Sequence, residues 1–92
     1  METFREQLRR YRTRRGISML ALAERADLSD ALLSRLQSGH RAPTTRSVGQ
    51  LVAALTLTRD EADGFYAAAR LVPPDLTSET FATLLAAHRT AA

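Results

Sequence analysis

The side chains best suited to recognising another molecule lie in the segment 28–39, LSDALLSRLQSG. Leu33 and Leu36 fall on one side of a helix in this segment. The opposite side then carries the residues that are free to contact something else, which are Ser29, Asp30, Ala31, Leu32, Ser34 and Arg35. Hydroxyl, carboxylate and guanidinium groups on one exposed helix suit hydrogen bonding to a polar surface. A helix held rigidly in this way has the geometry that enters the major groove of DNA.

The sequence offers no comparable set of residues for covalent catalysis or metal binding. The sequence contains no cysteine, which excludes a disulfide, a thiolate nucleophile and a cysteine-based zinc site. Its two histidines, His40 and His88, are far apart in sequence, so we expect no metal site. Paired carboxylates suited to a cleft, a phosphate-binding loop and a nucleophile triad are all missing. We therefore expect no enzymatic activity, no cofactor and no small-molecule substrate.

The charge of the chain is unevenly distributed. All 13 basic residues are arginines, and the net charge is +3. Residues 1–50 carry ten arginines against five acidic residues, whereas residues 51–92 carry three arginines against five acidic residues. The positive first half favours a polyanion as partner, although a solvated basic surface would give the same count. No apolar run approaches the ~20 residues of a membrane span and the N-terminus lacks a signal-peptide pattern, so we expect a cytoplasmic protein.

The elements that must position these residues are all predicted to be helices, so the fold class is all-α. Serine and threonine caps, glycine stops and apolar spacing predict five helices. They run from about Thr3 to Arg15, from Ser18 to a break at Asp27, from Ser29 to Gly39, from about Thr45 to Leu55 with Thr44 as cap, and onward from Thr58. Thr3 with Glu6 and Thr58 with Glu61 have the spacing of a capping box.

The second and third helices are joined by a turn of three or four residues. A steep crossing of two helices requires a small residue at the contact, and Ala23 provides it. Leu28, just after the turn, is expected to fill the corner, while Leu33 and Leu36 face Leu22 and Ala26.

This arrangement resembles the helix-turn-helix domain of the phage-repressor and xenobiotic-response-element (XRE, Cro/cI) type. The similarity covers about Leu8 to Leu55 and is carried by RTRRGISMLALAERADLSDALLSRLQSGHRAPTTRSVGQLVAAL. The matching features are the G-I-S entry to the second helix, LA at Leu22–Ala23, LS at Leu28–Ser29, LSRL at Leu33–Leu36, Gly39 and Pro43.

The resemblance implies a role for individual residues. The positions that usually meet base edges are occupied by Asp30, Ala31, Leu32 and Arg35. The positions that usually contact DNA phosphates are occupied by Met19, His40, Arg41 and Thr44. Ser29 and Ser34 are two further candidates for phosphate contact, and plain solvation is the favoured alternative for Ser34. Arg35 would pair with guanine O6 and N7, although a surface arginine paired with a nearby acid is the alternative. Leu32 could equally be partly buried in the core.

Four positions depart from the family pattern. The family favours glutamine at Met19, glycine at Asp27, and a glutamate at Gln37 that pairs with Arg12. Met19 cannot donate to a phosphate, and Asp30 adds a negative charge to the reading face. The neutral Gln37 leaves Arg12 at best a hydrogen bond. Arg5, Arg9 and Arg12 share one face of the first helix and form either a DNA flank or a solvated stripe with Arg12 turned toward Gln37.

The C-terminal part is separated by Pro73 and Pro74, which cannot continue a helix. We expect residues 1–72 to form the DNA-binding domain and residues 73–92 a helical tail, with a last helix from about Ser78 to Arg89. The residues expected at a homodimer interface are Phe65, Phe81, Leu84 and Leu85.

The sequence thus predicts a transcriptional regulator, most simply a repressor, that binds a palindromic site in double-stranded DNA as a homodimer. The alternative is a protein-interaction module, such as an antitoxin-like partner, that uses the same scaffold with weak or no affinity for DNA.

Overall fold

The computed structural model describes residues 2–73, and this part of the chain contains five helices and no strand. They are α1 (Phe4–Arg15), α2 (Met19–Ala26), α3 (Asp30–Ser38), α4 (Thr45–Leu55) and α5 (Arg59–Ala68). The predicted all-α class is therefore confirmed. The expected last helix, with Phe81, Leu84, Leu85 and His88, lies outside the described residues.

Every one of these helices is preceded by a serine or threonine whose side-chain oxygen accepts a hydrogen bond from a backbone N–H three residues later. The caps are Thr3, Ser18, Ser29, Thr44 and Thr58. The two predicted capping boxes, Thr3 with Glu6 and Thr58 with Glu61, are present. A cap of this kind satisfies backbone donors that the helix itself leaves unpaired and contributes about 1 kcal/mol.

The first four helices end at residues in the left-handed conformation. Gly16 and Gly39 adopt φ angles of 65° and 85°, which glycine tolerates without steric cost. Asp27 ends α2 with a φ of 56°, so the predicted break is found there and aspartate replaces glycine in it. Thr56 ends α4 with a φ of 53°, a conformation that is rare for a β-branched residue.

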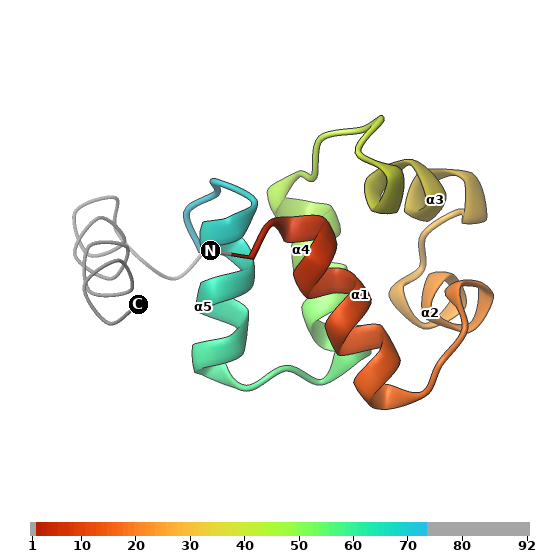
Figure 1. Cartoon of the computed structure of the whole chain (residues 1–92), viewed down its shortest axis with the longest axis horizontal. Coiled ribbons are helices and arrows are strands. Elements are labelled where there is room, and N and C mark those ends of the chain that lie inside the picture. Colours follow the sequence, from red (N-terminus) through yellow and green to blue (C-terminus); the bar gives the residue numbers. More distant parts are fainter. Residues whose placement is uncertain (1, 74–92) are drawn as a thin grey trace.

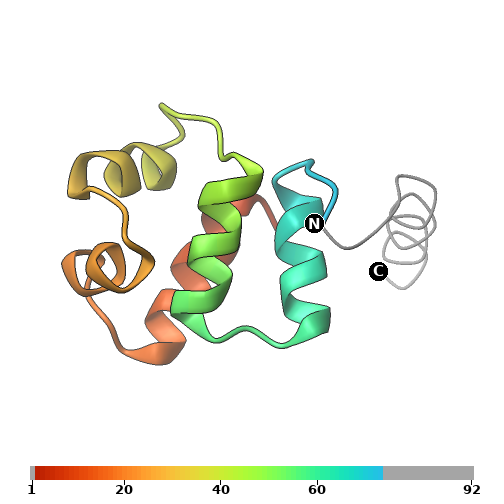
Figure 2. The same cartoon turned by 180° about the vertical axis from the view of Figure 1, so that it is seen from behind.

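The hydrophobic core lies where α1 and α4 pass side by side. Figures 1 and 2 show α5 on one side of this pair and α2 with α3 on the other. The fully buried side chains include Leu8, Leu22, Leu51 and Leu55. Phe65 of α5 is also fully buried, stacking on Phe4 at 4.6 Å between ring centroids and meeting the edge of Tyr11 at 5.9 Å.

The contact between α2 and α3 depends on Ala23, which is completely buried. The backbone N–H of Leu28 donates to the Ala23 carbonyl at 2.9 Å, and Leu28 packs against the core. Leu33 and Leu36 are 1% exposed, so one side of α3 is fixed to the rest of the domain. The predicted helix pair is confirmed, and α3 is held by its buried side with its other side toward solvent.

Among residues 2–73, no helix is long and apolar enough to span a membrane.

Candidate nucleic-acid interface

The outward side of α3 is open to solvent. Asp30, Ala31, Ser34 and Arg35 are exposed. Ser29 is exposed as well, but its hydroxyl already accepts the Leu32 N–H at 3.1 Å as the helix cap. The groups on this side whose side chains make no hydrogen bond or ion pair with the described residues are the Asp30 carboxylate, the Ser34 hydroxyl and the Arg35 guanidinium.

Two of the expected contact residues also support the core. Leu32 and Met19 are half-buried and pack against the core cluster. Only part of each side chain can therefore touch a ligand. Met19 follows the Ser18 cap directly at the start of α2, so its backbone N–H is better placed to meet an anion than its thioether.

The loop between α3 and α4 takes its shape from the last turn of α3. The backbone N–H groups of His40 and Arg41 both donate to the Arg35 carbonyl, at 3.0 and 3.2 Å. The Ser38 hydroxyl lies 2.7 Å from His40 Nδ1. Because these bonds involve the backbone and Nδ1, the exposed Arg41 guanidinium and the His40 Nε2 remain available for a ligand.

Helix α4 is preceded by its capping residue Thr44, whose hydroxyl is occupied by the cap. It accepts the Ser47 N–H, while the Thr44 N–H donates to Ser47 Oγ at 2.9 Å. The sequence did not predict this third capping box, because serine replaces the glutamate or glutamine of the usual motif. Any contact of Thr44 with a phosphate would therefore share its hydroxyl with this cap.

Acidic residues pair with arginines mainly on the side of α1 and α5. Arg10 contacts Glu2 at 2.7 Å, and Arg14 of α1 contacts Glu61 of α5 at 2.6 Å. The third ion pair in the described part of the chain joins Arg59 and Asp63 within α5 at 3.5 Å. Within each of these three pairs the two charges compensate one another.

The segment from α3 to the start of α4 is different. Arg35, Arg41 and Arg46 are exposed and have no ion pair with any residue in the described range. Arg46 is a candidate that the sequence analysis missed. It lies in the first turn of α4, where the helix dipole disfavours a positive charge. A bound anion would offset this unfavourable interaction. An arginine in the first turn of a predicted helix is therefore a sequence signal that could have identified Arg46 as a phosphate contact.

The structure corrects one expected dimer residue. Phe65 is 0% exposed and is enclosed by Phe4 and Tyr11 of its own chain. The sequence predicted Phe65 at a homodimer interface, but its side of α5 is directed into the core. Phe65 therefore has no surface to offer a second copy.

The expected hydrogen bond between Arg12 and Gln37 is replaced by two others. Arg12 Nη1 donates to the Ile17 carbonyl at 3.0 Å, and Gln37 Nε2 donates to the Arg5 carbonyl at 3.1 Å. Arg12 Nε and Gln37 Oε1 remain buried without a partner within the described residues. Arg12 thus joins α1 to the entry of α2, and Gln37 joins α3 to α1.

The comparisons with known proteins agree with this geometry. A family model described as a helix-turn-helix domain matches residues 3–65, which include all of α1 to α4 and the capped start of α5. No curated protein matches the chain. No solved structure matches it either. Since the family model covers well over half of the chain, the protein belongs to the helix-turn-helix domain family, a family of DNA-binding regulators.

Proposed function

We propose that this protein is a sequence-specific transcriptional regulator of the phage-repressor and xenobiotic-response-element type, acting as a repressor. In this proposal α3 enters the major groove of double-stranded DNA. The observation that carries the proposal is the combination of an exposed α3 with three unpaired arginines, Arg35, Arg41 and Arg46, along one continuous segment. A polyanion that follows this segment would neutralise charges that the described part of the protein leaves uncompensated.

Base recognition is assigned to the outward side of α3. Arg35 would donate two hydrogen bonds to guanine O6 and N7, and Asp30 would accept one from a cytosine amino group. Ala31 and the exposed part of Leu32 would contact thymine methyl groups. A bidentate arginine–guanine pair provides about 1–3 kcal/mol of discrimination between bases.

Phosphate contacts are assigned to both ends of α3 and to the loop that follows it. His40, Arg41 and Arg46 would provide cations, and the first turn of α4 would present backbone N–H groups after Thr44. Ser29 and Ser34 would add hydroxyl contacts. At the start of α2, the backbone of Met19 would replace the amide side chain that the family favours.

A homodimer would place two copies of α3 in successive major grooves, ~34 Å apart on a palindromic site. With Phe65 removed from the interface, the dimer contacts that we propose are Phe81, Leu84 and Leu85 of the tail, residues 73–92. Truncation after Val72 should convert the protein to a monomer in a measurement of molecular mass in solution. A truncated protein that is still a dimer would place the interface in residues 1–72.

Binding-site selection from a random pool of duplex DNA tests the central assignment. The wild-type protein should enrich a palindrome with a guanine in each half-site, and Arg35→Ala should lose the preference at that guanine. Arg70→Ala is the matched control, because Arg70 is also exposed and lacks an ion pair with the described residues but follows α5. An unchanged guanine preference in Arg35→Ala contradicts the assignment. Placing the selected site in a reporter promoter then separates repression from activation.

The second candidate function is a protein-interaction module that uses the same side of α3. It is favoured by the negative charge of Asp30 and by the half-buried Leu32 and Met19, which are unusual groups for a DNA-reading surface. Affinity for random duplex DNA at a low and a moderate salt concentration separates the two functions. Measurable binding that weakens with salt supports the regulator, whereas no binding even at low salt supports the interaction module.

A further inference from the structure

Arg5 extends from the first turn of α1 to the end of α3. Its Nη1 donates a 2.9 Å hydrogen bond to the carbonyl of Ser38, the last residue of α3. A guanidinium at this point satisfies a carbonyl that the helix leaves unpaired and faces the negative end of the helix dipole. Arg5 therefore caps α3 from a different helix.

The Arg5 side chain also lies directly against Gly39. A Cβ atom added at Gly39 would come within 3.0 Å of Arg5 Nη1 and 3.2 Å of its Cδ and Cζ. Gly39 is in the left-handed conformation, with a φ of 85°. The positive φ favours glycine at this residue, and an added Cβ would in addition displace the Arg5 side chain by a few tenths of an ångström. A second hydrogen bond joins the same two helices, with Gln37 Nε2 of α3 donating to the Arg5 carbonyl of α1 at 3.1 Å.

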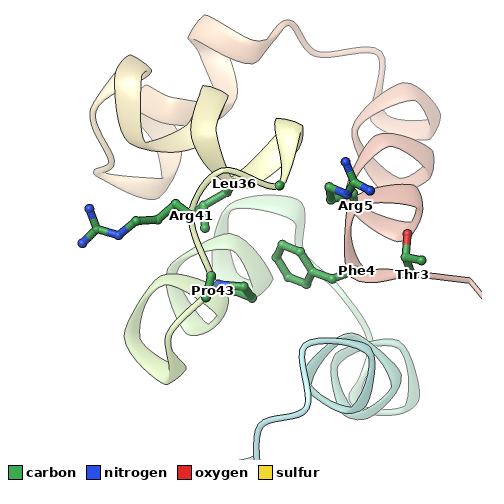
Figure 3. Close-up of a pocket in the computed structure, with 8 residues that line it drawn as sticks. Thr3, Phe4, Arg5, Leu36, Arg41 and Pro43 are labelled. Atoms are coloured by element: carbon green, nitrogen blue, oxygen red, sulfur yellow. The ribbon is translucent and has the colours of Figure 1, made fainter.

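The loop that follows has little packing beneath it on this side. A hollow of about 220 Å³ lies between the first turn of α1 and residues 41–43. Figure 3 shows Phe4 directed toward Pro43 and Leu36 across this hollow, while Arg41 extends away from α1. The polar contacts of α1 in this region reach the end of α3 and not the loop itself, because Arg5 donates to the Ser38 carbonyl and the Arg5 carbonyl accepts from Gln37.

The loop carries two of the cations assigned to DNA phosphates, His40 and Arg41. Their backbone N–H groups both depend on the last turn of α3, through the Arg35 carbonyl. We propose that Arg5 is a positioning residue for the nucleic-acid interface, which fixes the end of α3 and thereby the placement of His40 and Arg41. The DNA part of this proposal rests on the proposed function. Its structural part, that Arg5 restrains the loop, does not.

The alternative role for Arg5 is a direct contact with a DNA phosphate, and a double-mutant cycle distinguishes the two. We expect Arg5→Ala and Arg41→Ala each to weaken binding of the selected DNA site about fivefold to tenfold, the range of one ordinary net hydrogen bond. If Arg5 acts through the loop, the double variant should lose clearly less than the product of the single losses. Multiplying losses, or an Arg5→Ala protein that binds like the wild type, would overturn the proposal. Arg9→Ala removes an exposed arginine one turn further along α1 and is the charge-matched control.

Hydrogen exchange in the free protein tests the restraint without DNA. In Arg5→Ala the amides of His40 and Arg41 should exchange about tenfold faster than in the wild type, while core amides of α4 change much less. Arg9→Ala should leave both loop amides unchanged. Unchanged loop amides in Arg5→Ala, or an equal acceleration throughout the domain, would overturn the restraint.

A second variant displaces Arg5 without changing any charge. Gly39→Ala should displace the Arg5 side chain by a few tenths of an ångström, strain the left-handed backbone at residue 39, and accelerate exchange of the same two amides. Gly16→Ala is its control, because Gly16 has a similar φ of 65° and no atom within 4 Å of the added Cβ. Equal effects of the two glycine variants at the loop would contradict a specific contact with Arg5. If the wild-type protein binds no DNA, the proposed function fails, but these exchange measurements still decide the role of Arg5.

Discussion

At the scale of single residues, Thr56 is the β-branched one of the three non-glycine residues with positive φ in the described chain. Its φ of 53° lies in the left-handed region, where a β-branched side chain is a rare exception. The conformation is supported from outside, because Arg15 donates to the Leu55 and Thr56 carbonyls at 2.9 and 2.8 Å. The two hydrogen bonds from one guanidinium cap α4 and hold the turn that leads to α5.

Replacing Thr56 by glycine should therefore stabilise the domain. Glycine adopts the left-handed conformation freely and keeps the backbone carbonyl that Arg15 uses, so we expect the free energy of unfolding to rise by about 1 kcal/mol. Urea denaturation measures this change. Ala53→Gly, an exposed position within α4, is the control and should destabilise by a similar amount. A Thr56→Gly protein that is less stable than the wild type would show that the threonine side chain contributes a contact that outweighs the strain.

At the scale of the elements, the first turn of α4 combines a local cost with a proposed benefit. Arg46 lies two residues after the Thr44 cap, at the positive end of the helix dipole. A negative residue there should stabilise the helix by about 0.3–1 kcal/mol at low salt. We expect Arg46→Glu to raise the free energy of unfolding and at the same time to weaken DNA binding at least tenfold, because it adds repulsion to the loss of a phosphate contact.

Thermal unfolding and DNA titration of the same Arg46→Glu sample check both parts. Arg25→Glu is the matched control, since Arg25 lies in the last turn of α2, where the dipole favours a cation. This variant should be less stable than the wild type. Tighter DNA binding by Arg46→Glu would remove Arg46 from the interface.

The start of α5 links two elements through one carboxylate. The Thr58 N–H donates to Glu61 at 2.9 Å and lowers the pKa of the Glu61 carboxyl below its ordinary value of 4.5, and Arg14 lowers this pKa further. A carboxyl whose pKa is lower in the folded protein contributes stability above the pKa of the unfolded chain. That contribution is lost as the pH falls through the folded pKa.

Glu61→Gln should accordingly reduce the pH dependence of stability below about pH 4.5, because glutamine cannot titrate. The measurement is the free energy of unfolding from urea titrations between neutral and acid pH. Glu24→Gln serves as control, since Glu24 is exposed and has no ion pair with the described residues. If Glu61→Gln leaves the acid limb as steep as in the wild type, Glu61 makes no net contribution to the pH dependence.

At the scale of the whole molecule, the sequence predicts helices better than it predicts their contacts. Thr3 and Glu6, or Thr58 and Glu61, are three residues apart, so a capping box is visible in the sequence itself. The bond from Arg5 to Ser38 joins residues 33 positions apart. The hydrogen bond from Arg14 to Glu61 joins residues 47 positions apart. Only the folded arrangement brings the residues of either pair together.

The same distinction explains the two errors at the candidate site. The spacing of Phe65 showed an apolar face of α5 but not whether this domain or a second copy covers it, and the structure places it against Phe4. Gln37 was expected to face Arg12, yet the Arg5 carbonyl is the acceptor it reaches. In contrast, the exposed side of α3 followed from periodicity alone, because Leu33 and Leu36 determine which side is buried.

The division of charge across the molecule leads to a prediction for the salt dependence of DNA binding. Arg41 and Arg46 lack ion pairs with the described residues, whereas Arg10 and Arg14 are held by Glu2 and Glu61. Each arginine that neutralises a phosphate should contribute about 0.9 to the slope of the logarithm of the binding constant against the logarithm of the salt concentration. Arg41→Ala and Arg46→Ala should each reduce the slope by about that amount.

Arg10→Ala and Arg14→Ala remove the same charge from the side of α1 and α5, and they should leave the slope close to the wild-type value. The distinction lies in position, because all four variants lower the net charge equally. Titrations of one duplex at several salt concentrations measure the slope for each variant. Equal reductions in all four would mean that DNA responds to the total charge of the protein, and a reduction confined to Arg10 and Arg14 would place the DNA on the opposite side from α3. A reduction confined to Arg41 and Arg46 is the result expected if the DNA lies along α3 and the start of α4.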